Sequence, residues 1–186
     1  PDDNFEQALI DLGYDDVLND FVLTANISGV TYLNVAGNEI SDLTGIEAFT
    51  ALTYLNCDNN QLTSLNVSAN ASLNTLTCYA NLLTSLNITN NSELSSLNCL
   101  NNQLINLDVS NNTVLNELHS NNNQLTSLDV SANTALTNLQ CQNNQLTTLD
   151  VSTNTALSEL HCQNNQLTSL DVSNNTALIG LSCQDN

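Results

Sequence analysis

One stretch of this sequence recurs along most of the chain at a fixed interval. "LQCQNNQLTTLDVSTNTAL", from Leu139 to Leu157, is nearly repeated in "LHCQNNQLTSLDVSNNTAL", from Leu160 to Leu178, and looser copies lie upstream. The interval is 21 residues, and Ser120 fills the one vacant position in a column of six cysteines: Cys57, Cys78, Cys99, Cys141, Cys162 and Cys183. A fixed period of this length predicts similar structural units that stack on one another.

Each unit has the form L-x-x-L-x-C-x-x-N-x-L-x-x-L-x-V/I-S/T-x-N, beginning with Leu52. Neighbouring residues of a strand point to opposite sides, so Leu55 and Cys57 are expected to point inward and Asn56 outward. A unit then supplies about six inward apolar side chains, each contributing about 1.5–3 kcal/mol when fully buried. No unit can close a core alone, so the pattern predicts a core shared between neighbours.

The opening of each unit is typical of a leucine-rich repeat. The segments "NNQLTSLDVSNNTAL" and "PDDNFEQALIDLGYDD" resemble segments of secreted leucine-rich-repeat proteins of Bacteroidetes-type marine bacteria, and the unit from Val30 resembles the internalin-type repeat. The resemblance implies a solenoid with a parallel β-sheet on its concave face. It also implies a secreted or cell-surface protein used for adhesion or recognition, and part of a longer polypeptide.

The same resemblance assigns a structural role to one column of asparagines. In leucine-rich repeats this residue turns inward and bonds backbone groups of its own and neighbouring coils. The column consists of Asn38, Asn60, Asn81, Asn102, Asn123, Asn144, Asn165 and Asn186. We therefore expect an asparagine ladder immediately after the strands.

The chain divides into an N-terminal cap, residues 1–29, and a solenoid, residues 30–186, of about seven full coils and a truncated last one. "DDNFEQALIDLG" predicts a helix in which Asp3 and Glu6 form the N-terminal capping pair and Gly13 ends the helix. The apolar residues that follow are expected to continue the cover over the first coil: Val17, Leu18, Phe21 and Val22. "QLTSLDV" repeats the L-x-x-L-x-V spacing, which predicts an extended convex side, and no C-terminal cap is evident.

The composition excludes several classes of partner. The chain has no Lys or Arg and 19 acidic residues, giving a formal charge of -19. Nothing is available to neutralise phosphates, so nucleic acid and anionic membranes are excluded as partners. No apolar run approaches the roughly 18 residues of a membrane span, and a secreted or cell-surface location is expected.

The titratable side chains do not form a catalytic motif. His119 and His161 share an outward column two coils apart, about 9.6 Å, which is too far for both to bind one zinc ion. Ser120 points to the opposite side of the strand from His119, so the two cannot act as nucleophile and base. The cysteines are expected to be buried, reduced substitutes for leucine. The sequence therefore predicts a protein that is not an enzyme and has no obligatory cofactor.

One row of carboxylates is a candidate calcium site. Asp108, Asp129, Asp150 and Asp171 recur at the repeat period, about 4.8 Å apart in stacked coils, with no basic residue to offset their charge. Solvation by water and salt is the alternative, because Ca²⁺ prefers six to eight oxygen ligands.

The concave face carries the candidate binding site. Amides beside aromatic rings suit a polysaccharide, and an outward Leu beside a Tyr suits a protein. The candidate ligand-binding residues are Tyr32, Tyr54, Asn56, Tyr79, Asn98, Leu100, His119, Gln140, Gln142, His161 and Gln163.

Two further functions compete with recognition. Thr63, Thr84, Thr126, Thr147 and Thr168 form a regular column, interrupted by Ile105, that would suit an ice-binding surface. The repeat alone would suffice for a passive spacer in a larger adhesin.

Overall fold

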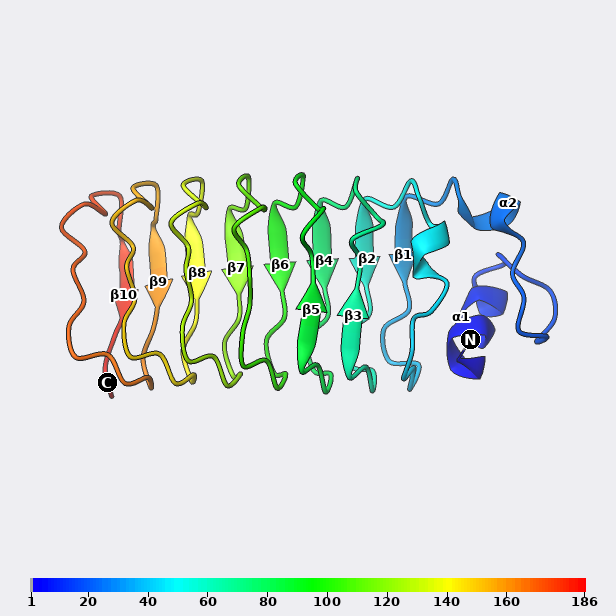
Figure 1. The fold of residues 1–186 in the computed structure, drawn as a ribbon, viewed down its shortest axis with the longest axis horizontal. Helices are drawn as coiled ribbons and strands as arrows, with labels where there is room; N and C mark the ends of the chain where they lie inside the picture. Colours follow the sequence, from blue (N-terminus) through cyan, green and yellow to red (C-terminus); the bar gives the residue numbers. More distant parts are fainter. Residues whose placement is uncertain (1) are drawn as a thin grey trace.

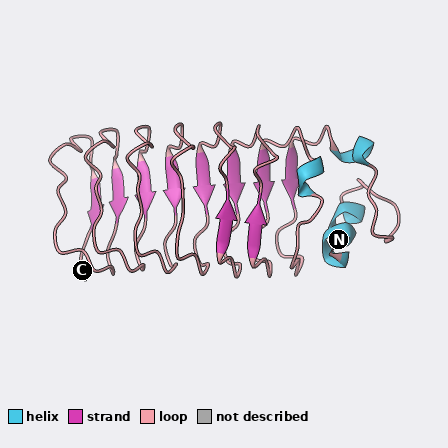
Figure 2. Cartoon of the chain, viewed as in Figure 1, coloured by secondary structure: helices cyan, strands magenta, loops and turns pink. Residues whose placement is uncertain are grey.

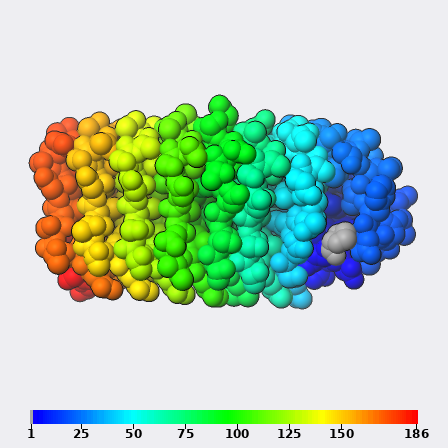
Figure 3. Space-filling model, in the orientation of Figure 1, coloured from blue at the N-terminus to red at the C-terminus, as the bar shows by residue number. Residues whose placement is uncertain are grey.

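The computed structural model describes residues 2–186, which form a solenoid with a helical cap at its N-terminal end (Figure 1). The cap contains α1 (Asp3–Asp11) and the short helix α2 (Thr24–Ile27). From β1 onward the coils lie side by side, and Figure 3 shows them as successive bands along the long axis. Neither α1 nor α2 is long enough to cross a bilayer, and no other helix in residues 2–186 qualifies.

One side of the solenoid is an eight-stranded parallel sheet with the order β1-β2-β4-β6-β7-β8-β9-β10. Its strands are β1 (Tyr32–Asn34), β2 (Tyr54–Asn56), β4 (Thr75–Thr77), β6 (Ser96–Asn98), β7 (Glu117–His119), β8 (Asn138–Gln140), β9 (Glu159–His161) and β10 (Gly180–Ser182). Leu55 pairs with Leu76 and Leu76 with Leu97, so equivalent positions of successive coils are in register. The predicted parallel sheet is confirmed.

The other side of the coils is extended, with few assigned strands (Figure 2). β3 (Ser64–Asn66) and β5 (Ser85–Asn87) pair in parallel register as a two-stranded sheet. The first coil has a 3₁₀ turn at Ile46–Ala48 instead. Leu125, Leu128 and Val130 are buried, while Thr126 and Asp129 are exposed, so the inward and outward pattern continues where no strand is assigned.

The core is one continuous apolar column running through all coils. Leu55, Cys57 and their equivalents in the middle coils are fully buried, as the pattern predicts. All six cysteines are free thiols, and five are buried. Cys183 is exposed, contrary to the expectation for its column, because no further coil packs against the last one in residues 2–186.

The predicted asparagine ladder is present beside the sheet. Asn81 is buried, and its Nδ2 donates to the carbonyl oxygens of Cys57 (3.0 Å) and Cys78 (3.1 Å). Its Oδ1 accepts a hydrogen bond from the backbone N–H of Leu62 at 3.0 Å. From Asn60 onward, each amide of this row thus satisfies backbone groups of two coils that would otherwise be buried without partners.

A second buried asparagine row, which the sequence analysis did not identify, lies at the opposite corner of the coils. It consists of Asn70, Asn91, Asn112, Asn133, Asn154 and Asn175, all buried. The Nδ2 of Asn91 donates to the carbonyl oxygens of Val67 (3.1 Å) and Asn70 (2.7 Å). The sequence indicates this row, because the last residue of every "VSxN" segment is Asn although the residue before it varies.

The turn after each strand places one residue in the left-handed region. Asn59, Asn101, Asn122 and their equivalents have φ near 55°, a conformation that Asn tolerates better than most residues. Ala80 occupies this position between Asn59 and Asn101. From Asn101 onward the exposed side chains form a third ladder, in which Asn122 Nδ2 donates to Asn101 Oδ1 at 2.7 Å and Asn143 Nδ2 to Asn122 Oδ1 at 2.6 Å.

The cap helix begins one residue earlier than expected. Asp2, not Asp3, is the N-cap, and its Oδ1 accepts hydrogen bonds from the backbone N–H groups of Asn4 and Phe5. Its Oδ2 accepts from the N–H groups of Ser41 and Asp42, which joins the cap to the first coil. The predicted helix and its end at Gly13, with φ of 79°, are confirmed.

Glu6 is not a capping partner, because its buried carboxylate faces the loop that follows α1. It accepts hydrogen bonds from the backbone N–H groups of Asn19 (2.8 Å) and Asp20 (2.9 Å). The hydrogen bond from Asn19, together with those from Asp20 and Phe21, lowers the pKa of Glu6 although burial raises it. Glu6 therefore holds the loop as a fixed, charged acceptor.

The prediction that the apolar residues after α1 cover the core is wrong for three of the four. Val17 is 51% exposed, Leu18 48% and Phe21 65%, while Val22 packs against the core. Phe5 and Leu9 of α1 already fill the end of the solenoid, and Phe5 lies 6.4 Å from Phe49 between ring centroids.

Replacing an asparagine of the second buried row is expected to destabilise the fold. Asn91→Ala removes two hydrogen bonds to backbone carbonyls and should lower the free energy of unfolding by about 1–3 kcal/mol. Urea denaturation followed by circular dichroism measures the change. The neighbouring Asn90→Ala is the control, because Asn90 is exposed; equal losses for both variants would contradict a bridging role for Asn91.

The cysteine column is expected to resist thiol reagents in the folded protein. Burial raises the pKa of Cys99 to about 12 and that of Cys162 to about 11, so few thiolates form at pH 8. Ellman's reagent should label one thiol, Cys183, in the native protein and all six in concentrated urea. Cys183→Ser should abolish native labelling, and rapid labelling of that variant would show that the column is accessible.

Candidate functional site

Three rows of outward side chains cover the eight-stranded sheet, and we call this surface the sheet face. The first row is Tyr32, Tyr54, Thr75, Ser96, Glu117, Asn138, Glu159 and Gly180. The second is Asn34, Asn56, Thr77, Asn98, His119, Gln140, His161 and Ser182. The third follows the strands and is Ala36, Asp58, Tyr79, Leu100, Asn121, Gln142, Gln163 and Gln184. The structure thus places all eleven predicted ligand-binding residues on one face.

Two tyrosines stack at the N-terminal end of the sheet face. The rings of Tyr32 and Tyr54 lie 4.5 Å apart between centroids with an interplanar angle of 10°. Tyr32 is 55% exposed and Tyr54 is half-buried. Burial raises the pKa of the Tyr54 hydroxyl, and Tyr32 and Asp58 raise it further. The pair presents a rigid, neutral aromatic surface.

A buried carboxylate supports this part of the face. Asp58 is 4% exposed; its Oδ2 accepts from the Thr77 hydroxyl at 2.9 Å and its Oδ1 from the Tyr79 N–H at 2.8 Å. Burial raises the pKa of Asp58, and these two hydrogen bonds only partly oppose the rise. Asp58 fixes the backbone that carries Tyr79, a role that sequence reasoning missed because the position looked merely polar.

Tyr79 and Leu100 are half-buried neighbours in the third row. Their coils are joined by the Ala80 N–H, which donates to the Leu100 carbonyl at 3.1 Å. Asn98 Oδ1 accepts from the Leu100 N–H at 3.3 Å, and Asn56 Oδ1 accepts from the Asp58 N–H at 2.9 Å. Asn56 and Asn98 therefore also brace the turn that ends their strand.

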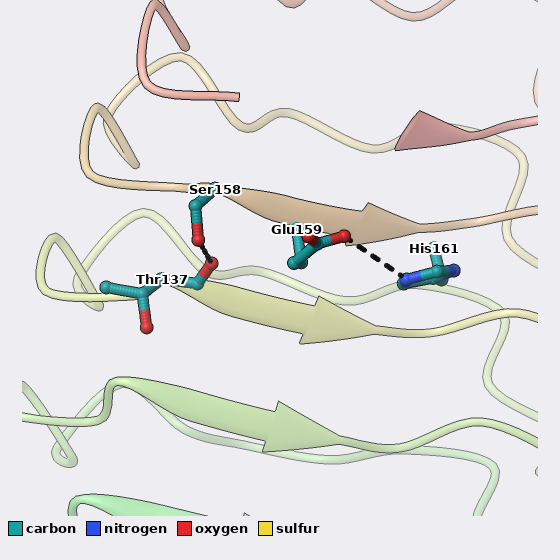
Figure 4. Close-up of polar contacts among 4 residues, drawn as sticks. All are labelled: Thr137, Ser158, Glu159 and His161. Atoms are coloured by element: carbon teal, nitrogen blue, oxygen red, sulfur yellow. Dashed lines mark hydrogen bonds and ion pairs between the residues drawn. The ribbon is translucent and has the colours of Figure 1, made fainter. Parts of the chain in front are cut away.

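A glutamate and a histidine meet further along the sheet face (Figure 4). Glu159 Oε2 lies 3.7 Å from His161 Nε2, with both residues on β9. Gly180 on β10 makes room for this glutamate, because a Cβ there would collide with Glu159 Oε2. The adjacent Ser158 hydroxyl donates to the Thr137 carbonyl at 3.0 Å, which ties the coils together.

His119 is half-buried on β7. Burial lowers the pKa of His119, with Glu117 opposing and His161 adding to the decrease. The two histidines are separated by Gln140, the strand partner of both. His119 is therefore a neutral hydrogen-bonding group near pH 7.

Several polar groups on the sheet face have unused hydrogen-bonding capacity. Within residues 2–186, five such atoms are buried without partners: His119 Nε2, Asn121 Oδ1, Asn138 Oδ1, Gln142 Oε1 and Gln163 Oε1. An unpaired buried acceptor is unfavourable, so side-chain rotation toward a ligand with donors would be favourable.

The described residues contain no group of three His, Cys, Asp or Glu arranged to hold a metal ion. Ser120 is fully buried, and its hydroxyl donates to the Gln140 carbonyl. The serine and His119 thus point to opposite sides of their strand, as expected.

The aspartate row lies on the side opposite the sheet face and has a structural role. Asp108, Asp129 and their equivalents are exposed, and Oδ1 of each accepts a hydrogen bond from the backbone N–H two residues on, at 3.0 Å from Ser110 and 2.9 Å from Ser131. Hydrogen bonds from these serines lower the pKa of both carboxyl groups. Asn66 makes the same contact with Ser68, which explains why only Asn and Asp occupy the row. Calcium binding by Asp108, Asp129, Asp150 and Asp171 stays a prediction.

Comparison with known proteins identifies the repeat. Residues 28–70 match the family model described as leucine-rich repeats (2 copies). Internalin J of Listeria monocytogenes serotype 4b (strain F2365) is 41% identical over 70 residues, which are 38% of this chain and 8% of that protein. The chain therefore carries leucine-rich repeats and has an internalin-like homologue.

Solved structures show the same architecture over the whole chain. The functional domain of InlJ from Listeria monocytogenes, which includes a cysteine ladder, superposes with a TM-score of 0.82 and 36% identity, covering 100% of this chain and 46% of that one. Internalin C2 from strain 4b F2365 has a TM-score of 0.65 and 23% identity, covering 97% and 93%. The fold is the leucine-rich-repeat fold, and the chain spans less than half the length of either InlJ relative.

The raised pKa of Asp58 is expected to make the effect of Asp58→Asn on stability depend on pH. The pKa of this carboxyl is raised in the fold, so its charged form weakens the fold above the folded pKa and the effect vanishes below the unfolded value of about 3.9. Asn has one acceptor oxygen and loses one of the two hydrogen bonds from Thr77 and Tyr79 at every pH. The melting temperature of Asp58→Asn minus that of the wild type should therefore be higher at pH 7 than at pH 3. Calorimetry at both pH values measures this difference, with Asp129→Asn as an exposed control; a difference that does not rise with pH would contradict the raised pKa.

Proposed function

We propose that this chain is a non-enzymatic recognition module that binds a protein or a polysaccharide through the sheet face. The observation that carries the proposal is the N-terminal half of that face, where the Tyr32–Tyr54 stack lies in the same surface as Tyr79 and Leu100. The only carboxylate among these rows up to β6 is Asp58, which is buried. A large, uncharged surface with fixed aromatic rings is suited to adhesion.

The chemistry of the face fits both ligand classes. Aromatic rings pack against the apolar faces of sugars, and the amides of Asn98, Gln140, Gln142 and Gln163 can exchange hydrogen bonds with hydroxyl groups. Tyr and Leu at the centre of a face can equally anchor a protein partner. The unpaired acceptors near Gln142 and Gln163 favour a ligand rich in donors.

The proposed location is extracellular, either secreted or at the cell surface. The internalin-like relatives and the resemblance to secreted Bacteroidetes-type proteins support it. The excess of negative charge keeps such a protein soluble.

The opposite side of the solenoid offers weaker support for ice binding. The Thr63 row is exposed, but Ile105 interrupts it and the exposed carboxylates of the Asp108 row lie beside it. We therefore place the binding surface on the sheet face. Thermal hysteresis in a nanolitre osmometer, lost on Thr126→Ala plus Thr147→Ala, would move it to the threonine row.

Binding is expected to depend on two tyrosines of the sheet face. The fluorescently labelled protein is applied to a polysaccharide array and to an array of extracellular proteins, and the affinity for retained ligands is measured by titration. Tyr54→Ala plus Tyr79→Ala should weaken binding at least tenfold, about 1.4 kcal/mol, because both rings lose their contact area.

The matched control replaces two exposed residues of the opposite side, Thr63→Ala plus Thr126→Ala, and should retain wild-type affinity. A ligand whose affinity changes with the threonine variant and not with the tyrosine variant would contradict the proposed site. Absence of any retained ligand on both arrays would instead favour a passive spacer in a larger adhesin.

A further inference from the structure

The N-terminal cap has several exposed apolar side chains that do not belong to the rows of the sheet face. Leu12, Val17, Leu18, Phe21 and Leu23 are each between 46% and 65% exposed. They lie between the end of α1 and the start of α2, in the cap at the N-terminal end of the solenoid in Figure 1. Exposed large apolar side chains gathered in one segment commonly mark an interaction surface.

Phe21 forms part of an apolar cavity between the cap and the first coil. The cavity has a volume of about 180 Å³, and its apolar wall is formed by Phe5, Leu9, Phe21, Val22, Ile27 and Phe49. A cavity of about 150 Å³ is large enough for benzene. This one therefore has room for a single apolar side chain of a partner.

The same phenylalanine also forms part of a second, acidic pocket. This pocket has a volume of about 380 Å³ and is lined by Asp15, Asp16, Phe21, Leu23 and Asn26 among others. Asp15 Oδ2 is buried without a hydrogen-bond donor in residues 2–186. A cation in this pocket would offset the negative charges of Asp15 and Asp16, while its aliphatic stem packed on Phe21 and Leu23.

The two pockets are preformed by hydrogen bonds to the loop backbone. Glu6 accepts from Asn19, Asp20 and Phe21, and Asn26 Nδ2 donates to the Tyr14 carbonyl at 3.0 Å. Asp20 takes a left-handed conformation with φ of 66°. A loop held in this way loses little conformational freedom when a partner binds.

We propose that the cap binds a basic segment of another protein, with an apolar side chain in the cavity and a neighbouring Lys or Arg in the acidic pocket. Charge complementarity selects this occupant, because the pocket is acidic and the whole chain has a formal charge of -19. A second copy of this chain does not fit, since it has no Lys or Arg to place beside Asp15 and Asp16. No residue that lines either pocket belongs to the rows of the sheet face, so the two sites are distinct.

The test uses fluorescein-labelled 12-residue peptides in which Lys or Arg lies one or two positions from Leu or Phe, with binding to the full chain followed by fluorescence anisotropy. These peptides should bind at least ten times more tightly than versions in which Glu replaces each cation. Phe21→Ser and Asp15→Asn plus Asp16→Asn should each weaken binding at least tenfold. Circular dichroism verifies that both variants fold.

Two matched variants separate this site from general attraction to an acidic protein. Val17→Ser removes another exposed apolar residue, which lines neither pocket, and Asp129→Asn plus Asp150→Asn removes the same charge elsewhere. Both should bind like the wild type, as should Tyr54→Ala plus Tyr79→Ala. Failure of every peptide to bind, equal weakening by the Asp129 and Asp150 variant, or a Phe21-dependent dimer in sedimentation velocity would overturn the proposal.

Discussion

Stacked coils of extended chain can exist only if the backbone groups at their corners find partners, because those groups are buried where no sheet hydrogen bonds reach them. Two rows of asparagine amides meet this requirement. At one corner, Asn81 reaches carbonyls of its own coil and the preceding one and accepts from Leu62. At the other, Asn91 bridges the carbonyls of Val67 and Asn70. These bonds hold the coils in register, and the register in turn aligns the side chains into rows.

The straight rows explain how a repetitive sequence acquires a specific surface. Residues that point inward are nearly fixed, since Leu55, Leu76 and Leu97 occupy one buried row. Outward positions on the same strands are free to vary, and they do so in a directional way. Tyrosines gather toward the cap, whereas His119, His161 and the glutamines lie toward the other end. The chemistry of the sheet face therefore changes along its length, with tyrosine rings at one end and amides with the Glu159–His161 contact at the other.

Period and alternation predicted most of the repeating architecture. The burial of Leu55 and Cys57 and the common face of Tyr54, Gln140 and His161 followed from them, whereas the Asn81 ladder followed from the resemblance to leucine-rich repeats. The second buried row, which includes Asn91, also repeats but was not predicted. The exposure of Phe21 was not predicted either, because Phe5 and Leu9 already fill the end of the core and amphipathic spacing alone cannot reveal that competition. Likewise, Asp58 looked polar, and only the contacts with Thr77 and Tyr79 reveal a buried acceptor.

The absence of Lys and Arg affects both proposed binding surfaces. A chain without Lys or Arg cannot neutralise its carboxylates internally, so each carboxylate must be solvated, hydrogen-bonded to backbone or matched by a partner. Asp108 and Glu6 accept hydrogen bonds from backbone N–H groups, of Ser110 and of the loop after α1 respectively. Asp15 does not, since its Oδ2 has no donor within the described chain. The sheet face presents little uncompensated charge near β2, whereas the cap presents exposed apolar side chains and the carboxylate of Asp15, whose Oδ2 has no donor within the described chain. The two surfaces are therefore suited to chemically different partners.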